Sequence, residues 1–341
     1  MAGITRRKVF GLAAAGISLP FCQATAATRP DSVNLGFIAG SPRAWVLGKT
    51  DGSYEKAFGL PVKWVSFPSG AMALTLLAAG QIDIAVFGSS PIAAGISRKL
   101  PIQIIGAPEL IATNERLIVR SAISQINQLE GKTVAYPPSS TCQYTLEAAF
   151  KVHHVDSTKV RHLALTQTDT VAAWRRGDID AAYIPGPFWG QLLHDGGRQL
   201  LTSADLQRDG YYVWNSAVVR SEFAERYPDL VVAFLRTAQA SVDRYKADPA
   251  GASKALALNL GAPPEVTQEV LAGLTYPSLA EQISPRYWGT GPDTPTAPLV
   301  KALNDTARFL VDIGELKKVD VPASYASFVR VDLLVRANEK A

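Results

Sequence analysis

The sequence predicts an α/β protein made of two lobes, and three observations support this fold class. Short apolar segments bounded by glycine, proline or serine alternate with longer amphipathic ones, as strands alternate with helices in layered α/β folds. The chain has 341 residues, 47% of them hydrophobic, a length that fits two lobes better than one or three. A helix–Gly–strand unit also occurs once in each half of the chain.

The first half of the chain begins with alternating strands and helices. The strands predicted here are Val33–Phe37, Trp64–Phe67, Ile82–Phe87 and Ile102–Gly106, with helices at Ala71–Ala79 and Ile92–Ser97. Gly80 ends the first of these helices, at a position where left-handed backbone favours glycine.

A second series begins near Leu117 and leads into a helical region. Its strands are Thr133–Tyr136, Val160–Leu165 and Ile179–Ile184, with a capped helix within 139–153 and another at Asp169–Arg176 that Gly177 ends. After Tyr211–Arg220, the amphipathic pattern predicts one long helix at Ser221–Asp248. Thr275–Pro298 is rich in Pro, Gly and Thr and predicts an ordered excursion, and 297–313 is the last clear helix.

The repeated unit has a glycine stop, an Ile-Asp pair and a small-residue strand in the same order. It spans Ala79–Ala85 and Arg176–Ala182, and each copy leads into a proline-containing loop. Such units are common in α/β proteins, so the repeat alone indicates no function.

Residues 1–26 have the three-part layout of a secretory signal peptide. A cluster of three basic residues precedes an apolar run that is shorter than the roughly 18 residues a membrane span requires. The paired Arg6-Arg7 resembles a twin-arginine export signal. Lipoprotein anchoring at Cys22 is disfavoured because the bulky Phe21 precedes it. We therefore expect an exported protein.

Removal of this segment changes the charge and the cysteine count. It takes three of the 34 basic residues and no acidic one, so 31 basic residues remain against 30 acidic ones. The net charge of +4 therefore gives no support for nucleic-acid binding. Cys142 is then the single cysteine, so no intrachain disulfide can form.

Motifs for catalysis and for metal binding are absent or incomplete in the sequence. No G-x-S-x-G elbow occurs, and the S-x-x-K match at 53–56 lacks its partner motifs. The four histidines have no carboxylate or thiol at ligand spacing. Cys142 has no base near it in sequence. We therefore expect no metal, no cofactor and no catalytic nucleophile.

Two helix starts offer a different kind of site. Pro137–Thr141 follows a strand and opens a helix, with Ser140 or Ser139 as its N-cap. Ser89-Ser90-Pro91 repeats the arrangement, since proline suits the first turn of a helix. Free backbone N–H groups, hydroxyls and the positive end of a helix dipole together favour an anion. Two such starts, one in each half of the chain, could face each other across a cleft and hold a small anionic ligand.

Aromatic and basic residues near the ends of other strands are candidates for the walls of that cleft. Arg43 stands out in the loop GSPRAW, because an arginine among small residues suits a charged clamp on an anion. The other candidates are Phe37, Phe188, Trp189, Trp214 and Asn215.

Four motifs together resemble the periplasmic substrate-binding proteins of ABC importers that take up taurine, alkanesulfonates and nitrate. They are AAGQIDIAVFGSSP, LEGKTVAYPPSST, AAWRRGDIDAAYIPGP and VVRSEFAERYPDLVVAF, and the resemblance runs from about Val33 to Val329 and is closest to the taurine-type members. It implies a two-lobed periplasmic-binding-protein fold (type II), with a mixed sheet flanked by helices in each lobe and the ligand in the cleft. The implied lobes are 31–116 plus 218–341, and 117–217.

The resemblance also implies site residues, with three departures from the taurine-type pattern. Cys142-Gln143 replaces a hydroxyl residue and a histidine, Pro185-Gly186-Pro187 replaces a W-x-P loop, and Asn215 replaces an aspartate suited to an ammonium group. Because an amide lacks the charge of a carboxylate, taurine is less favoured than sulfonates in general. The predicted ligand-binding residues are Ser89, Ser90, Ser140, Thr141, Cys142, Gln143, Arg43, Phe37, Pro187, Trp189 and Asn215.

We therefore expect a periplasmic, non-catalytic solute receptor that closes on a small sulfonate or sulfate ester and is sensed by an ABC permease. It is expected to be a monomer without cofactor and without nucleic acid. Three alternatives stay open: a receptor for another oxyanion such as nitrate, a receptor for an aromatic carboxylate, and an enzyme of the same fold, of the thiamine-pyrimidine type. A nucleophile–base pair in the cleft would favour the enzyme.

Overall fold

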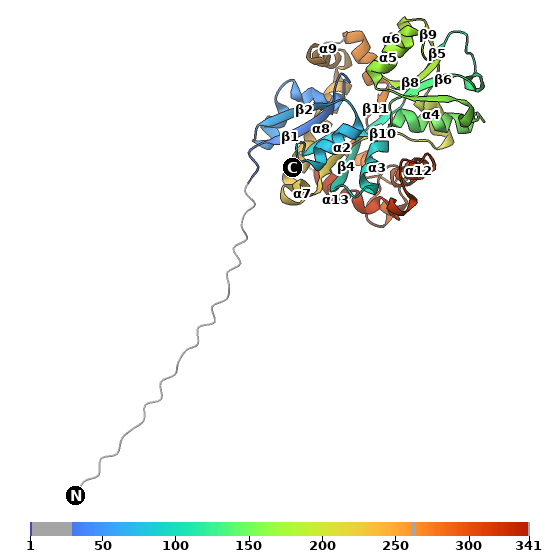
Figure 1. Cartoon of the computed structure of the whole chain (residues 1–341). Coiled ribbons are helices and arrows are strands. Elements are labelled where there is room, and N and C mark those ends of the chain that lie inside the picture. The colour runs from blue at the N-terminus through green and yellow to red at the C-terminus, as the bar shows by residue number, and fades with distance from the viewer. Residues whose placement is uncertain (2–28, 261–262, 340–341) are drawn as a thin grey trace.

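The computed structural model describes residue 1 and residues 29–260 and 263–339. It contains two mixed sheets flanked by helices (Figure 1). This is the α/β architecture that the sequence predicts. The predicted signal peptide, apart from Met1, lies outside the described residues, and so does Cys22.

The first sheet has six strands in the order β11-β4-β10-β3-β1-β2. They are β1 (Val33–Ile38), β2 (Val62–Phe67), β3 (Ile84–Gly88), β4 (Ile102–Ile111), β10 (Trp214–Arg220) and β11 (Leu274–Thr275). β1 is parallel to β2 and β3, whereas β10 is antiparallel to its neighbours β3 and β4. The apolar run of β3 is buried from Ile84 to Phe87, as expected of a central strand that is covered on both faces.

The second sheet has five strands in the order β7-β6-β8-β5-β9. They are β5 (Glu115–Arg120), β6 (Thr133–Tyr136), β7 (Arg161–Ala164), β8 (Ala181–Pro185) and β9 (Gly197–Thr202). β6 is parallel to β7 and β8, and β5 is antiparallel to β8 and β9. Leu117 and Val119 of β5 lie in one apolar cluster and Ile118 lies in another, so this sheet has a core on each face.

Helices flank both sheets (Figure 1). In the first half of the chain they are α1 (Ser53–Phe58), α2 (Gly70–Ala78), α3 (Ser89–Ser97), α4 (Thr141–Val152) and α5 (Gln167–Arg176). In the second half they are α6 (Phe188–His194), α7 (Ser221–Arg226), α8 (Pro228–Ala247), α9 (Pro249–Leu260), α10 (Pro264–Ala272), α11 (Leu279–Gln282), α12 (Pro298–Asp312) and α13 (Val331–Asn338). Among the short 3₁₀ segments are η1 (Ala44–Lys49) and η4 (Ser203–Asp209).

The chain passes between the two sheets twice. It leaves the first sheet after Ile111 and enters the second at Glu115, and it returns between Thr202 and Trp214. These crossings lie a few residues before the lobe borders predicted at 117 and 218. We refer below to the part around the first sheet as the first lobe and to the part around the second sheet as the second lobe.

Helix α10 also joins the two lobes. Although it follows α8 and α9 of the first lobe in the chain, its Val270 is fully buried in an apolar cluster of the second sheet. The carbonyl of Gly273, just after α10, accepts hydrogen bonds from the backbone N–H groups of Ala112 and Asn114, at 3.2 and 3.0 Å. The first crossing is therefore held by α10 and not only by its own strands.

The Ile-Asp unit is a structural repeat. In the first sheet the Asp83 carboxylate accepts a hydrogen bond from the backbone N–H of Asn34, at 2.9 Å. In the second sheet the Asp180 carboxylate accepts one from the backbone N–H of Thr133, at 2.8 Å. Each aspartate also donates its own backbone N–H to the carbonyl of the same partner, at 2.9 Å. The two aspartates thus fix the register of β3 on β1 and of β8 on β6 in the same way.

Two predictions about C-terminal helices are wrong. Ser221–Asp248 is not one helix, because Tyr227 has non-helical backbone angles (φ −134°, ψ 52°) and Pro228 starts α8 anew. The predicted helix at 297–313 is present as α12, but it is not the last one, since α13 follows it.

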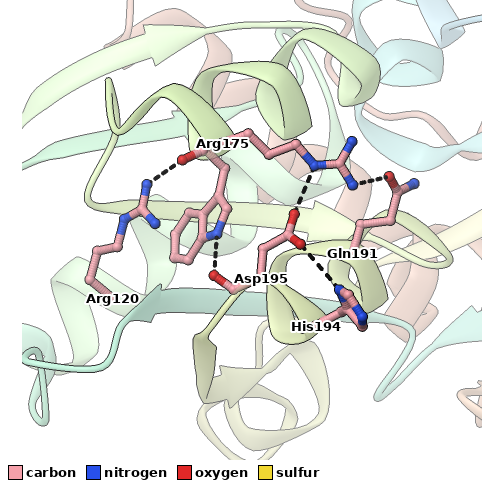
Figure 2. Close-up of polar contacts among 6 residues, drawn as sticks. Arg120, Arg175, Gln191, His194 and Asp195 are labelled. Carbon is pink, nitrogen blue, oxygen red and sulfur yellow. Dashed lines mark hydrogen bonds and ion pairs between the residues drawn. The ribbon is translucent and has the colours of Figure 1, made fainter.

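A polar cluster holds α5 against the end of α6 (Figure 2). Arg175 donates to the Asp195 carboxylate at 2.8 Å and to the Gln191 side-chain oxygen at 3.4 Å. The buried Trp174 donates from Nε1 to the Asp195 carbonyl at 3.4 Å, and the Arg120 guanidinium stacks on its indole at 3.8 Å. This corner of the second lobe is therefore held by its own contacts.

Gly177→Ala is expected to lower the free energy of unfolding by about 1 kcal/mol, measured by urea denaturation. Gly177 ends α5 with φ +83°, and a Cβ there would meet no atom within 4 Å, so the cost is conformational and not steric. Gly190 in α6 is the matched control, because it also has free space but no positive φ. Gly190→Ala should leave stability unchanged or raise it. Equal effects of the two substitutions would contradict this account.

Candidate functional site

A cavity of about 170 Å³ lies between the two sheets, at the carboxyl ends of their parallel strands. Open α/β sheets commonly bind ligands at this edge. The segments that follow β1, β2 and β3 line the cavity from the first lobe with Ser41, Ser69 and Gly88, among others. The segments that follow β6, β7 and β8 line it from the second lobe with Ser140, Thr166 and Gly186, among others.

Helix α3 brings Ser89 and Ser90 to this edge. The helix begins at Ser89 with Gly88 as its N-cap, three residues before the start predicted at Ile92. Pro91 is tolerated inside the first turn because the N–H that it lacks would have no partner within the helix. The cavity wall reaches Gly88 and Pro91, on either side of the two serines. Both serine side chains are fully buried, and neither hydroxyl has a hydrogen-bond partner among the described residues.

Helix α4 brings a second set of hydroxyls from the other lobe. Ser140 is its N-cap, as predicted, and the Ser140 hydroxyl accepts from the backbone N–H of Gln143 at 3.2 Å. The same hydroxyl donates to the Pro137 carbonyl, and Thr141 donates its hydroxyl to the Glu115 carboxylate. Ser139, Ser140, Thr141 and Cys142 all line the cavity.

The starts of α3 and α4 approach each other closely. A Cβ atom placed on Gly88 would lie 3.1 Å from Cγ2 of Thr141, so only glycine fits this contact without a shift. The first residues of the two helices, one from each lobe, are therefore close together. The two serine-rich motifs predict such an approach of two helix starts; that both bind one anion stays a prediction.

A buried charged group, built from Arg43, Glu109 and Asn215, lies beside α3. Asn215 of β10 pairs with Gly88 of β3 on one side and with Glu109 of β4 on the other. The Arg43 Nε is 3.7 Å from the Glu109 carboxylate, and Asn215 Nδ2 donates to the same carboxylate at 3.0 Å. The Arg43 Nη1 is buried without a hydrogen-bond partner in the described structure. Arg43 and Asn215 line the cavity, whereas Glu109 lies behind them.

Glu115 is a second buried carboxyl group, and it lines the cavity directly. It accepts hydrogen bonds from Thr141 and, at 3.4 Å, from the Ser203 hydroxyl. Burial raises the pKa of Glu115, although its bonds to Thr141, Cys142 and Ser203 and the charge of Arg43 oppose this. Burial and the charge of Glu115 both raise the pKa of the Cys142 thiol well above its usual range. Burial likewise raises the pKa of Glu109.

Six of the predicted site residues lie outside the cavity lining: Ser89 and Ser90, described above, and Phe37, Trp189, Gln143 and Pro187. Phe37 packs edge-on against Trp64, with ring centroids 6.1 Å apart. Trp189 donates from Nε1 to the Asn114 carbonyl at 3.0 Å. The other two have local roles: Gln143 accepts the Ser139 N–H at 2.7 Å, and Pro187 is the N-cap of α6 after a cis peptide bond.

Sequence reasoning missed Glu109 and Glu115. Each is a carboxyl residue inside or beside an apolar strand, in the stretches IQIIGAPELI and ERLIVR. A charged residue is almost never fully buried without a partner. A glutamate inside or beside an apolar strand was therefore the available sequence signal for a buried polar site. Phe188, which sequence reasoning considered for the wall, does line the cavity next to Gly186.

Two negative findings apply to the described residues. No group of three or more His, Cys, Asp or Glu side chains there could hold a metal ion. No helix in residues 29–260 or 263–339 is long and apolar enough to cross a membrane.

Comparison with known proteins gives matches over most of the chain. Residues 26–260 match the model of the NMT1-like family. The chain is 32% identical to the taurine-binding periplasmic protein of Escherichia coli over 280 residues, which are 80% of this chain and 84% of that protein.

Two solved structures have the same fold. One is the alkanesulfonate-binding protein SsuA from Xanthomonas axonopodis pv. citri bound to MOPS, with a TM-score of 0.73, 22% identity, and coverage of 89% of this chain and 99% of that one. The other is the desulfurization enzyme DSZB, with a TM-score of 0.61, 15% identity, and coverage of 90% and 99%. At these identities the likeness concerns the fold, and the fold is found in both a binding protein and an enzyme.

Proposed function

Because this chain belongs to the NMT1-like family and is homologous to a periplasmic taurine-binding protein over most of its length, we propose that it is the solute receptor of an ABC importer for a small sulfonate. The sulfonate lies between the starts of α3 and α4. The hydroxyls of Ser89 and Ser90 and the adjacent backbone N–H groups donate to its oxygens, and Ser140 and Thr141 turn their hydroxyl donors to it from Pro137 and Glu115.

One observation carries this proposal above the others. Ser89 and Ser90 have fully buried hydroxyls with no hydrogen-bond partner in the described structure, at the N-terminus of a helix that faces a second helix N-terminus. Buried hydroxyls normally have a hydrogen-bond partner, so two buried hydroxyls that lack one require a further acceptor. An oxyanion supplies acceptor oxygens together with the negative charge that both helix dipoles favour.

The cavity size supports a small ligand. Its volume of about 170 Å³ lies below the roughly 300 to 1,000 Å³ that is typical of sites for drug-sized ligands.

Closure of the two lobes over the ligand is part of this proposal. Ser41 of the first lobe donates to the Gly186 carbonyl of the second at 3.4 Å. Ser139 of the second lobe donates to the Glu315 carboxylate of the first at 2.6 Å. These contacts exist only when the lobes are together, so a ligand that contacts both lobes shifts the balance toward the closed form. The proposed rigid units are close to those predicted (31–116 with 218–341, and 117–217), with their borders moved to the chain crossings at 112–114 and 203–213.

We propose binding without catalysis. The pair that an enzyme would need is Cys142 with Glu115 as its base, since Glu115 is a hydrogen-bond partner of the thiol. A nucleophilic cysteine needs a lowered pKa, whereas burial and the neighbouring carboxylate hold the pKa of Cys142 well above its usual range. The thiol then stays protonated and acts as a hydrogen-bond donor to Glu115.

The cellular setting follows from the same proposal. The protein is exported to the periplasm by its N-terminal signal, with the paired arginines as a twin-arginine signal. There it acts as a monomer, without cofactor or nucleic acid, and its closed form is sensed by an ABC permease in the inner membrane.

A thermal-shift screen of the exported form tests this function. A sulfonate at 100 times its Kd should stabilise the protein by about 2.7 kcal/mol, which raises Tm by about 5 °C. Taurine, ethanesulfonate, an aryl sulfate, nitrate and bicarbonate are the test ligands. 2-Aminoethanol, which is taurine's analogue without the sulfonate, is the matched control and should give no shift. A shift with nitrate or bicarbonate alone would reassign the receptor to another oxyanion.

A further inference from the structure

The hydroxyl of Thr141 has a single proton, and its hydrogen bond to Glu115 already uses that proton. Thr141 Oγ1 donates to Oε1 of Glu115, and both residues line the cavity. A hydroxyl donates one hydrogen bond and accepts up to two. Toward the cavity, Thr141 therefore presents lone pairs and not a donor.

A bound sulfonate would meet those lone pairs. On the proposed function, Thr141 stands between two oxygen anions, the carboxylate of Glu115 and the sulfonate, with one proton to share between them. If Thr141 turns its proton to the sulfonate, Glu115 loses a donor and faces a new negative charge in a buried site. Unpaired acceptors and unpaired charges of this kind are costly when buried.

One added proton resolves the conflict. A protonated Glu115 donates to Thr141 Oγ1, and Thr141 then donates to the sulfonate, so that every group in the chain is satisfied. Glu115 is also the group placed to take this proton. It is 97% buried and is held by donors only, Thr141 and Cys142 from α4 and Ser203 from η4.

Among the described residues, no other group that acts on Glu115 titrates near neutral pH. The charged or titratable side chains that act on it are Arg43 from the segment after β1, Cys142 from α4 and Tyr183 from β8. Arg43 keeps its positive charge. Burial is the main cause that raises the pKa of Cys142 and of Tyr183 well above their usual ranges, so both stay neutral.

Resting on the sulfonate-receptor function, we propose that Glu115 is a specificity-determining acid that binds one proton together with the sulfonate and relays its hydrogen bond through Thr141. The receptor thus takes up an anion and a proton as a unit. Glu109 has no such role, because it lies behind Arg43 and outside the cavity lining.

The sign of the pH dependence follows from this coupling. Unliganded Glu115 loses its proton as the pH rises through its pKa, which burial has raised, whereas in the complex it keeps the proton to a higher pH. Between those two values each unit of pH weakens sulfonate binding by up to tenfold, because a proton must be taken up with the ligand. Below the pKa of unliganded Glu115, affinity is independent of pH.

Calorimetric titration tests the proposal with ethanesulfonate, a probe that carries no ammonium group and hence no cation of its own to neutralise Glu115. Titrations from pH 5 to 9, in buffers of different ionisation enthalpy, give the number of protons taken up. We expect up to one proton per ethanesulfonate in the wild-type protein. Binding of ethanesulfonate without proton uptake at every pH would overturn the proposal.

Two variants separate the carboxyl groups. Glu115→Gln replaces the protonated acid by an amide that can donate to Thr141, so it should bind ethanesulfonate with no proton uptake and a constant Kd across the range. Glu109→Gln should keep the proton uptake of the wild type, even where its Kd differs. Persistence of uptake in Glu115→Gln would overturn the assignment to Glu115. Absence of ethanesulfonate binding in all three proteins, together with no thermal shift with any sulfonate of the screen, would instead refute the sulfonate-receptor function itself.

Discussion

Arg43→Met is expected to lower the free energy of unfolding of the unliganded protein by about 3 to 5 kcal/mol at neutral pH. Glu109 is fully buried, and Arg43 is the cationic side chain within 4 Å of its carboxylate. One Glu109 oxygen already lacks a hydrogen-bond partner in the described structure, so the variant leaves a buried carboxylate with Asn215 as its donor. Removal of one partner from this buried ion pair is therefore expected to cost more stability than removal of one partner from an exposed ion pair.

The loss should depend on pH in a defined direction. Burial raises the pKa of Glu109, and removal of Arg43, which lowers it, raises it further. The folded variant then holds a proton that the unfolded chain releases, so its stability falls as the pH rises from about 4.5 toward the raised pKa. Urea denaturation at pH 4.5 and pH 8 should show the smaller deficit at pH 4.5.

The double variant Arg43→Met/Glu109→Gln separates stability from binding. With the carboxylate gone, most of the lost stability should return, because no uncompensated charge remains. Affinity for a sulfonate should stay at least tenfold below that of the wild type, since the guanidinium that lines the cavity is missing. Full recovery of affinity in the double variant would remove Arg43 from the binding site.

Ser89→Ala/Ser90→Ala is expected to weaken sulfonate binding by about 1 to 3 kcal/mol for each lost hydrogen bond to the charged ligand, which is roughly fivefold to 150-fold per serine. Stability of the unliganded protein should stay the same or rise. Both hydroxyls are buried without partners in the described structure, so their removal deletes desolvated polar atoms and no hydrogen bond. Calorimetry and urea denaturation measure the two effects.

Ser97→Ala is the matched control on the same helix. Ser97 is as buried as Ser89, but its hydroxyl is hydrogen-bonded to the Tyr325 hydroxyl at 2.7 Å. Its replacement should therefore lower stability by about 1 kcal/mol and leave sulfonate affinity unchanged. If the double serine variant lost stability as Ser97→Ala does and kept its affinity, the two serines would be structural and not part of the site.

The local features of the fold were predictable from sequence because their causes are local. Gly80 and Gly177 have the positive φ expected where each ends a helix, and Ser140 caps α4 through its own side chain. The Ile-Asp repeat could also be recognised from sequence, although the contact behind it is not local. Each aspartate binds the start of a strand about 50 residues earlier in the chain.

The composition of the cavity was only partly predictable. Asn215 bonds to Glu109, 106 residues earlier, and Thr141 bonds to Glu115, 26 residues earlier. Such pairings depend on strand order, which periodicity does not give. Trp189 is the converse case: its position after a strand predicts a residue of the cavity wall, whereas its N–H donates to the Asn114 carbonyl and the residue lies outside the cavity lining.

The contact of α10 with the second sheet limits how the two lobes can move. If only the two chain crossings joined the lobes, the lobes could still twist and slide against each other in several directions. Val270 adds a third point of attachment from the C-terminal region, and the Gly273 carbonyl secures the first crossing to it. On the closure proposed above, we therefore expect the cleft to open by rotation of the lobes about an axis close to α10, where the two lobes stay in contact.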